Sequence, residues 1–248
     1  MQNFTSEGIN KLVDEDYQGA ISDFNNAIQV NPNDSFAYHM RASVKDSLGD
    51  YIGAILDYTT AITINPNDVN SYVARGMAKN GNQDYDGAKL DCDIAIEMDS
   101  NSVNAYHQRG VAKNSLEDYV GAIDDFNKVF ELNPMYRISY RHRGDAKFSL
   151  RDYMGAISDY NNAIEFNPSS AICYHMRGLA KVSLEDYRGA IVDYTRAIEL
   201  NPKMASAYLM RGLAKVNLKQ KESSCLDFSK ACELGSVKAY ELIKLFCK

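Results

Sequence analysis

The sequence predicts an all-α fold built from stacked, antiparallel helix pairs, and three observations lead to this prediction. The dipeptide Asp-Tyr recurs at a fixed interval of 34 residues, starting at Asp16-Tyr17. All five prolines fall at position 32 of this period, and 12 of the 15 glycines fall at position 8 or 19. Each period also holds two stretches with apolar residues three or four apart, which is the spacing of one helix face.

The period divides the 248 residues into seven repeats and a short tail. We place the repeats at residues 1–34, 35–68, 69–102, 103–136, 137–170, 171–204 and 205–238. Because a stacked array must shield its last apolar face from water, we expect a capping helix over residues 237–248. Its apolar residues would face inward and its charged residues outward: Val237, Tyr240, Ile243 and Phe246 against Lys238, Glu241, Lys244 and Lys248.

The fourth repeat illustrates how each pair is specified. Its first helix is expected from about position 3 to position 14, with Gly110 on the side that approaches the second helix. Asp118 fits an N-cap, since its carboxylate can accept hydrogen bonds from the first amides of the next helix. The second helix carries apolar residues at helical spacing, and Asn133-Pro134 ends it, because proline disfavours helical geometry in the residue before it. Gly110 and Ala122 leave room for a close approach, while Tyr106 and Phe126 fill the flanking space.

These positions resemble the tetratricopeptide repeat family, and the resemblance covers essentially the whole chain. In the sixth repeat, the matching residues are Tyr174, Gly178, Ala190, Tyr194, Ala197 and Pro202. The resemblance implies a right-handed α-solenoid that spans residues 1–248 as one domain. It also implies that the first helices line a concave surface, into which positions 2, 5, 6, 9 and 12 look.

Two positions depart from the family pattern. Position 7 is Arg in six repeats and position 11 is Lys in all seven, whereas position 23 is Asp throughout. We expect a charge ladder in which each Asp pairs with the Arg of the next repeat, as Asp57 with Arg75, because pairing within the first repeat would oppose Glu7 to Asp23. A solvated charge stripe is the alternative. The charge ladder comprises Arg41, Arg75, Arg109, Arg143, Arg177 and Arg211 with Asp23, Asp57, Asp91, Asp125, Asp159 and Asp193.

Composition and motifs argue against several classes of protein. The net charge of −6 disfavours nucleic-acid binding, and no apolar run reaches the roughly 18–20 residues that span a bilayer. We find no phosphate-binding loop, nucleophile elbow or metal motif, so we predict no enzyme activity, no cofactor and no metal.

The five cysteines form no CxxC pair, which favours free thiols in a reducing compartment. Cys92 takes the place of a core aromatic residue, and Cys225 and Cys232 are expected to be buried. The predicted location is cytoplasmic, or periplasmic or secreted if a leader has been removed.

Candidate binding residues lie on the first helices, where a stripe of Met, Leu and Val runs beside histidines and a basic cluster. Inter-helix packing is the alternative for the apolar ones, and a surface cluster neutralised by Asp145 is the alternative for the basic ones. Helices of neighbouring repeats are about 8–10 Å apart from axis to axis, too wide to bring histidine ligands together on one metal readily. The candidates are His39, Met40, Met77, His107, Val111, Arg141, His142, Asp145, His175, Met176, Leu179, Met210 and Leu213.

The predicted function is a non-enzymatic scaffold or adaptor that binds a peptide segment of a partner protein along the concave surface. Apolar burial would supply the affinity, and the cluster of Arg137, Arg141, His142 and Arg143 would anchor an acidic side chain, a carboxylate terminus or a phosphorylated segment. Two alternatives remain: an array that associates with itself as a homo-oligomer, and an accessory subunit of an enzyme complex.

Overall fold

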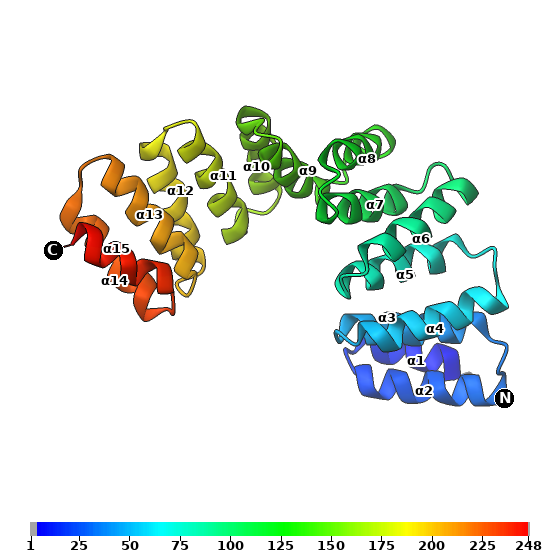
Figure 1. The fold of residues 1–248 in the computed structure, drawn as a ribbon. Helices are drawn as coiled ribbons and strands as arrows, with labels where there is room; N and C mark the ends of the chain where they lie inside the picture. The colour runs from blue at the N-terminus through cyan, green and yellow to red at the C-terminus, as the bar shows by residue number, and fades with distance from the viewer. Residues whose placement is uncertain (1–3, 248) are drawn as a thin grey trace. The chain divides into compact units, whose positions relative to one another are not determined.

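The computed structural model of the chain describes residues 4–247, which form helices joined by turns, with no strand (Figure 1). The predicted all-α architecture of helix pairs is confirmed. The first helices of the seven repeats are α1 (Phe4–Val13), α3 (Ser35–Ser47), α5 (Val69–Gly81), α7 (Val103–Ser115), α9 (Ser139–Ser149), α11 (Ala171–Ser183) and α13 (Ala205–Asn217). The second helices are α2 (Tyr17–Val30), α4 (Tyr51–Ile64), α6 (Tyr85–Met98), α8 (Tyr119–Leu132), α10 (Tyr153–Phe166), α12 (Tyr187–Leu200) and α14 (Lys221–Glu233), and α15 (Val237–Phe246) follows them.

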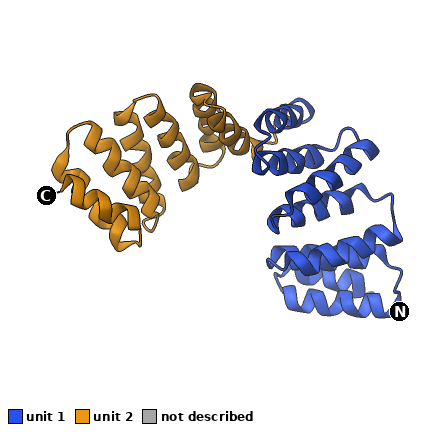
Figure 2. Cartoon of the chain, in the orientation of Figure 1, with its two compact units in different colours: residues 1–134 blue, residues 135–248 orange. Residues whose placement is uncertain are grey.

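The helices group into two compact units, residues 1–134 (unit 1) and residues 135–248 (unit 2) (Figure 2). Within each unit, a second helix packs against the first helix of its own repeat and against the first helix of the next. Successive first helices also contact one another, α3 with α5 and α5 with α7 in unit 1, and α9 with α11 and α11 with α13 in unit 2. Each unit is therefore a layer of first helices on a layer of second helices. That all seven repeats form one domain stays a prediction.

The Asp-Tyr dipeptides start the second helices, as predicted for Asp118. The Asp118 carboxylate accepts a hydrogen bond of 3.0 Å from the Gly121 amide, and the same contact recurs at the other five Asp-Tyr sites. A methyl group on Gly121 would overlap that carboxylate, which explains the glycine at position 19. The preceding turn holds Glu117 at a φ of 63°, a left-handed conformation that recurs at position 15 of each repeat.

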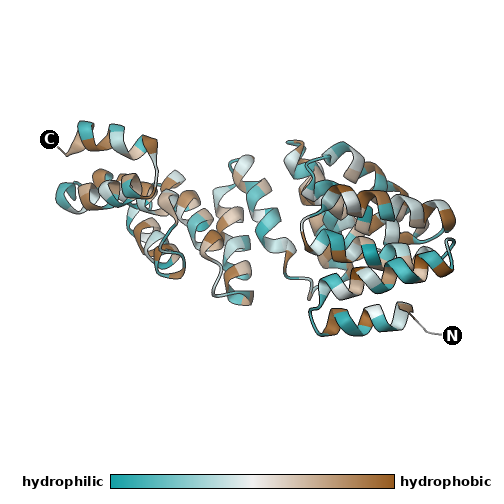
Figure 3. Ribbon diagram, turned by 90° about the horizontal axis from the view of Figure 1, so that it is seen from below, coloured by the Kyte–Doolittle hydropathy of each residue, from teal (hydrophilic) through white to brown (hydrophobic). Residues whose placement is uncertain are grey.

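The core of each helix pair forms where the aromatic ring at position 24 meets the small residue at position 8. The Phe126 ring is fully buried against Gly110, where a side chain would collide with it. Burying one such aromatic ring contributes about 2–3 kcal/mol. In the third repeat Cys92 replaces the ring, as predicted, and burial raises the pKa of its thiol to about 12. Polar and apolar residues alternate along the helices around this core (Figure 3).

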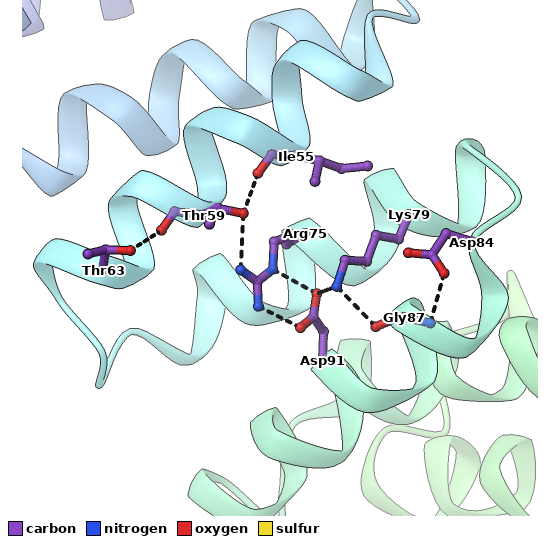
Figure 4. Close-up of polar contacts among 8 residues, drawn as sticks. All are labelled: Ile55, Thr59, Thr63, Arg75, Lys79, Asp84, Gly87 and Asp91. Carbon is purple, nitrogen blue, oxygen red and sulfur yellow. Dashed lines mark hydrogen bonds and ion pairs between the residues drawn. The ribbon is translucent and has the colours of Figure 1, made fainter.

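Repeats two to seven also bury an ion-pair network made by positions 7, 11 and 23. In the third repeat, Arg75 donates two hydrogen bonds to the Asp91 carboxylate, at 2.8 and 2.7 Å, and the Lys79 ammonium lies 2.9 Å from the same carboxylate (Figure 4). The remaining guanidinium nitrogen, Nη1, donates to Thr59 Oγ1 of the preceding repeat at 3.1 Å. Arg75 also lies over the ring of Tyr72, which gives it a cation–π contact.

The pairing predicted for the charge ladder is wrong, because the pairs form within repeats. Asp57 binds Arg41 and Lys45 of its own repeat, not Arg75. The hairpin turn places position 23 of the second helix opposite positions 7 and 11 of the first. In the first repeat Lys11 pairs with Asp23 at 2.7 Å. The acidic residue Glu7 at position 7 therefore does not prevent pairing within the repeat. The contact to the preceding repeat is made instead at position 25, by the pairs Arg41–Asn25, Arg75–Thr59, Arg109–Asp93, Arg177–Asn161 and Arg211–Thr195.

The C-terminal helix differs from the predicted cap. Ala239 is fully buried and Phe246 packs near the Phe228 ring, but Val237 and Tyr240, expected to face inward, are exposed. The helix therefore packs against α14 with a different face from the one predicted, and its solvent-exposed surface is partly apolar. Lys248 lies outside the described residues.

Two of the cysteines expected to be free thiols form a disulfide, which joins Cys225 of α14 to Cys247 after α15. Cys225 and Cys232 are half-buried, not buried as predicted. The spacing of 22 residues gave no sign of the bond, because the two residues meet only when α15 folds back on α14. The expectation of a reducing compartment rested on free thiols, so the disulfide no longer supports it.

We predict that Asp91→Ala lowers the free energy of unfolding by about 3 kcal/mol, because it leaves the Arg75 and Lys79 cations close together without a counter-charge. The Asp91 side chain is 3% exposed. Urea denaturation of the full chain measures the change. Asp23→Ala is the matched control: its only cation, Lys11, is 40% exposed, so the loss should be clearly smaller. Equal losses in the two variants would contradict a stabilising role for the paired cations.

Candidate functional site on the first helices

The predicted apolar stripe lies on the first helices, and its members differ in how far they reach the surface. Met77, at position 9 of α5, is exposed. The other apolar candidates are half-buried: Met40, Val111, Met176, Leu179, Met210 and Leu213. Met40 packs against the buried cluster of Ala20, Phe24 and Val44, and Met176 packs against the cluster around Tyr160. Inter-helix packing therefore accounts for part of the surface of these two methionines.

Two of the three histidines at position 5, His107 and His175, are buried and do not line a surface as predicted. His107 and His175 are 5% and 8% exposed, and their rings lie 5.9 and 5.5 Å from those of Phe126 and Tyr194. His39 packs on Tyr58 in the same way. Position 5 is thus on the side of the first helix that faces the core ring at position 24. A partner bound to the outer surface of α7 or α11 could not reach these imidazoles without displacing the packing.

A serine in the following repeat forms a hydrogen bond with the imidazole of His39. The repeat that follows His175 has no serine at the same position. His39 Nδ1 lies 2.8 Å from Ser71 Oγ, which is 32 residues further along the chain. The corresponding residue for His175 is Ala207, and His175 Nδ1 is buried with no hydrogen-bond partner among the described residues. Burial lowers the pKa of both histidines, and the nearby Asp68 carboxylate opposes this shift only at His39.

The basic cluster of the fifth repeat is only partly assembled. Arg141 Nη1 donates to the Asp145 carboxylate at 3.0 Å, and its Nη2 lies 2.8 Å from a ring nitrogen of His142. Asp145 also accepts a hydrogen bond from the Tyr160 hydroxyl at 2.8 Å. Burial raises the pKa of the Asp145 carboxyl, although Arg141 and Tyr160 both oppose that shift. Arg143 does not join this cluster, because it pairs with Asp159.

Three exposed apolar residues at position 2 are absent from the predicted set. They are Phe36 on α3, Ile138 just before α9 and Ile172 on α11. Position 2 lies seven residues, about two helical turns, before position 9 and so faces the same way as Met77. These three residues could have been predicted from the sequence, because the family resemblance implies that position 2 is exposed and exposed apolar residues often mark a binding surface.

The first-helix surfaces thus carry exposed apolar side chains, and those of unit 2 also carry the cationic cluster of the fifth repeat. Among residues 4–247, no group of three or more histidine, cysteine or acidic side chains could hold a metal ion. None of the helices described combines the length and apolar character that crossing a membrane requires.

Comparisons with known proteins point to one family of repeats. A family model described as TPR repeat matches residues 178–219, and one described as Tetratricopeptide repeat matches residues 37–68 and 103–135. No curated protein sequence matches the chain.

Several solved structures are similar to the chain. A tetratricopeptide repeat protein from Parabacteroides merdae is 20% identical, with a TM-score of 0.72 over 99% of this chain and 98% of its own. YrrB, described as a TPR protein with an unusual peptide-binding site, is 21% identical, with a TM-score of 0.64 over 75% of this chain and 97% of its own. MamA is 27% identical, with a TM-score of 0.61 over 66% of this chain and 96% of its own.

We predict that Ala207→Ser raises the free energy of unfolding by about 1 kcal/mol, because the new hydroxyl can satisfy the imidazole of His175. Ser71→Ala, which removes the partner of His39, should have the opposite effect. Thermal or urea unfolding of the two variants tests the pair. If Ala207→Ser destabilises the chain as much as Ser71→Ala does, the hydrogen bond is not the cause.

We also predict that stability falls as the pH is lowered from about 7.5 to about 5.5. The ordinary pKa of histidine is 6.5 and that of buried His175 is lower, so below pH 6.5 the unfolded chain binds more protons than the folded one. His175→Leu should reduce this pH dependence, since repeat seven carries Leu209 at the same position. Free energies of unfolding at several pH values provide the measurement. A slope that is identical in the variant would show that His175 does not contribute.

Proposed function

Because the chain is a tetratricopeptide repeat protein with about seven repeats and a C-terminal helix, we propose that it is an interaction scaffold that binds a peptide segment of a partner protein on its first helices. Binding needs no catalytic group in this proposal. The observation that carries it is the exposure of apolar side chains on the first helices of each unit: Phe36 and Met77 in unit 1, and Ile172 in unit 2. The similarity to YrrB, which is described as peptide-binding, supports it.

The second helices also expose apolar residues, such as Leu56 on α4 and Val192 on α12. These residues lie on the opposite layer of each unit, so they offer a matched comparison for the first-helix surface. A partner segment lying along the first helices of unit 1 would bury Met77 and leave Leu56 in water, and one lying along those of unit 2 would bury Ile172 and leave Val192 in water. Burial of one such side chain contributes about 1.5–3 kcal/mol, enough to change the affinity more than tenfold.

We predict that Met77→Asp removes a partner bound to unit 1 and that Ile172→Asp removes a partner bound to unit 2, while Leu56→Asp and Val192→Asp, the matched variants in the same units, retain it. Affinity capture from native lysate, with quantitative mass spectrometry of each variant against the unmodified chain, measures the loss. Circular dichroism should show unchanged helix content in all four variants. If the variants in the second helices lose the partner and those in the first helices keep it, the binding surface is on the other layer and the proposal fails.

A further inference from the structure

The first helix of the fifth repeat begins later than its counterparts. In repeats two, three, four, six and seven the first helix starts at position 1, whereas α9 starts at Ser139, which is position 3. Tyr136 takes the position that Asp34 and Asp68 use to cap α3 and α5. Arg137 and Ile138 form a turn instead, in which the Arg137 amide donates to the Met135 carbonyl at 2.8 Å.

This turn borders a cavity of about 170 Å³ within unit 2. Arg137, Ile138 and Arg141 form one side of the cavity, and Phe166 lines it from the end of α10. Ser170 and Cys173, at the start of α11, close the remaining side. Small-molecule sites usually measure about 300–1,000 Å³, so this cavity is too small for a cofactor or nucleotide and has room for one side chain.

The walls of the cavity combine positive charge with apolar surface. The Arg137 guanidinium has no hydrogen-bond acceptor or ion-pair partner among residues 4–247, whereas Arg141 pairs with Asp145 and contacts the His142 ring. Beside these cations, Ile138 and Phe166 are 55% and 56% exposed. A ligand that matches both the positive charge and the apolar surface has an anionic group at the end of an apolar chain.

The charge of the surrounding unit favours the same ligand. Residues 135–248 hold 18 Lys and Arg against 12 Asp and Glu, a net charge of +6, although the whole chain is at −6. Residues 1–134 hold 9 against 21, a net charge of −12. The cavity therefore lies in the part of the chain that attracts anions, and its unpaired Arg137 can bind a carboxylate through two parallel hydrogen bonds.

We propose that this cavity binds a glutamate side chain of an extended peptide, with the neighbouring apolar residue of that peptide covering Ile138 and Phe166. The inference rests on the proposed function and names the chemistry of the peptide. The methylene groups of the glutamate pack on the apolar wall, and its carboxylate binds Arg137 and Arg141. A partner segment recognised here pairs an internal acidic residue with an adjacent aliphatic one.

The test titrates the full chain with acetyl-Gly-Leu-Glu-Leu-Gly-amide and with the same peptide carrying Gln in place of Glu, followed by NMR. We expect saturable shifts at the Arg137 Nε–H and the Ile138 amide with the Glu peptide, and binding about tenfold weaker with the Gln peptide. Arg137→Gln should weaken binding of the Glu peptide to the same degree. Arg188→Gln, which removes the same charge from an exposed site on α12, should leave it unchanged.

Phe166→Gln tests the apolar wall without altering any charge and should also weaken binding. Equal binding of the Glu and Gln peptides, equal loss with Arg137→Gln and Arg188→Gln, or no saturable shift would overturn the proposal. Tighter binding of acetyl-Gly-Leu-Gly-Leu with a free carboxylate would overturn it too, because the ligand would then be a chain terminus. A partner lost with Ile172→Asp but kept with Arg137→Gln would refute the cavity alone and leave the proposed function standing.

Discussion

The structure depends on the burial of one carboxylate, that of the Asp at position 23, between the two helices of each repeat. The Asp at position 23 is buried in every repeat, and a buried carboxylate is costly unless cations and hydrogen bonds compensate it. In repeats two to seven, Arg at position 7 and Lys at position 11 supply both, as Arg75 and Lys79 do for Asp91. The network fixes the angle at which the two helices meet, because a planar guanidinium binds a carboxylate in only a few geometries.

The same arginine links one repeat to the next. Its third nitrogen reaches position 25 of the preceding repeat, while the guanidinium lies over the tyrosine at position 4, as Arg75 does with Thr59 and Tyr72. A displaced repeat would have to break these contacts as well as the apolar packing. Because positions 7 and 11 are polar, the apolar packing of the pair is concentrated at positions 8, 20 and 24, where Gly110, Ala122 and Phe126 meet.

On the first helices, Phe36 at position 2 and Met77 at position 9 lie outside these contacts, whereas Ile9 and Leu179, also at position 9, are half-buried. Apolar residues there, such as Phe36 and Met77, are exposed and available to a partner, whereas position 5 has been drawn into the core. The fifth repeat is the exception to the regular pattern. The helix α9 begins two positions later than its counterparts and Ile138 is exposed beside Arg137 and Arg141, so a local loss of regularity accompanies the cationic, apolar-walled cavity described above.

Sequence alone determined the features that depend on neighbours along the chain. The period, the Asp118 cap, the proline ends and the meeting of Gly110 with Phe126 could all be predicted, because each involves residues within one helix pair. The charged residues at positions 7 and 23 were also found, but their partners were not. In a sequence that repeats every 34 residues, a pair within a repeat and a pair between repeats have the same pattern, so Asp57 with Arg41 and Asp57 with Arg75 cannot be told apart.

Only the tertiary structure decided the contacts that depend on the rotation of one helix against another. It turned His107 and His175 inward, turned Val237 and Tyr240 outward, and brought Cys225 to Cys247. Successive residues of a helix are about 100° apart around its axis, so a rotation of the helix by that angle exchanges an inward position for an outward one. The spacing of apolar residues does not fix the rotation of the helix to within this angle. Packing against the neighbouring helices does, because only one rotation fills the space around each ring and satisfies the buried charges.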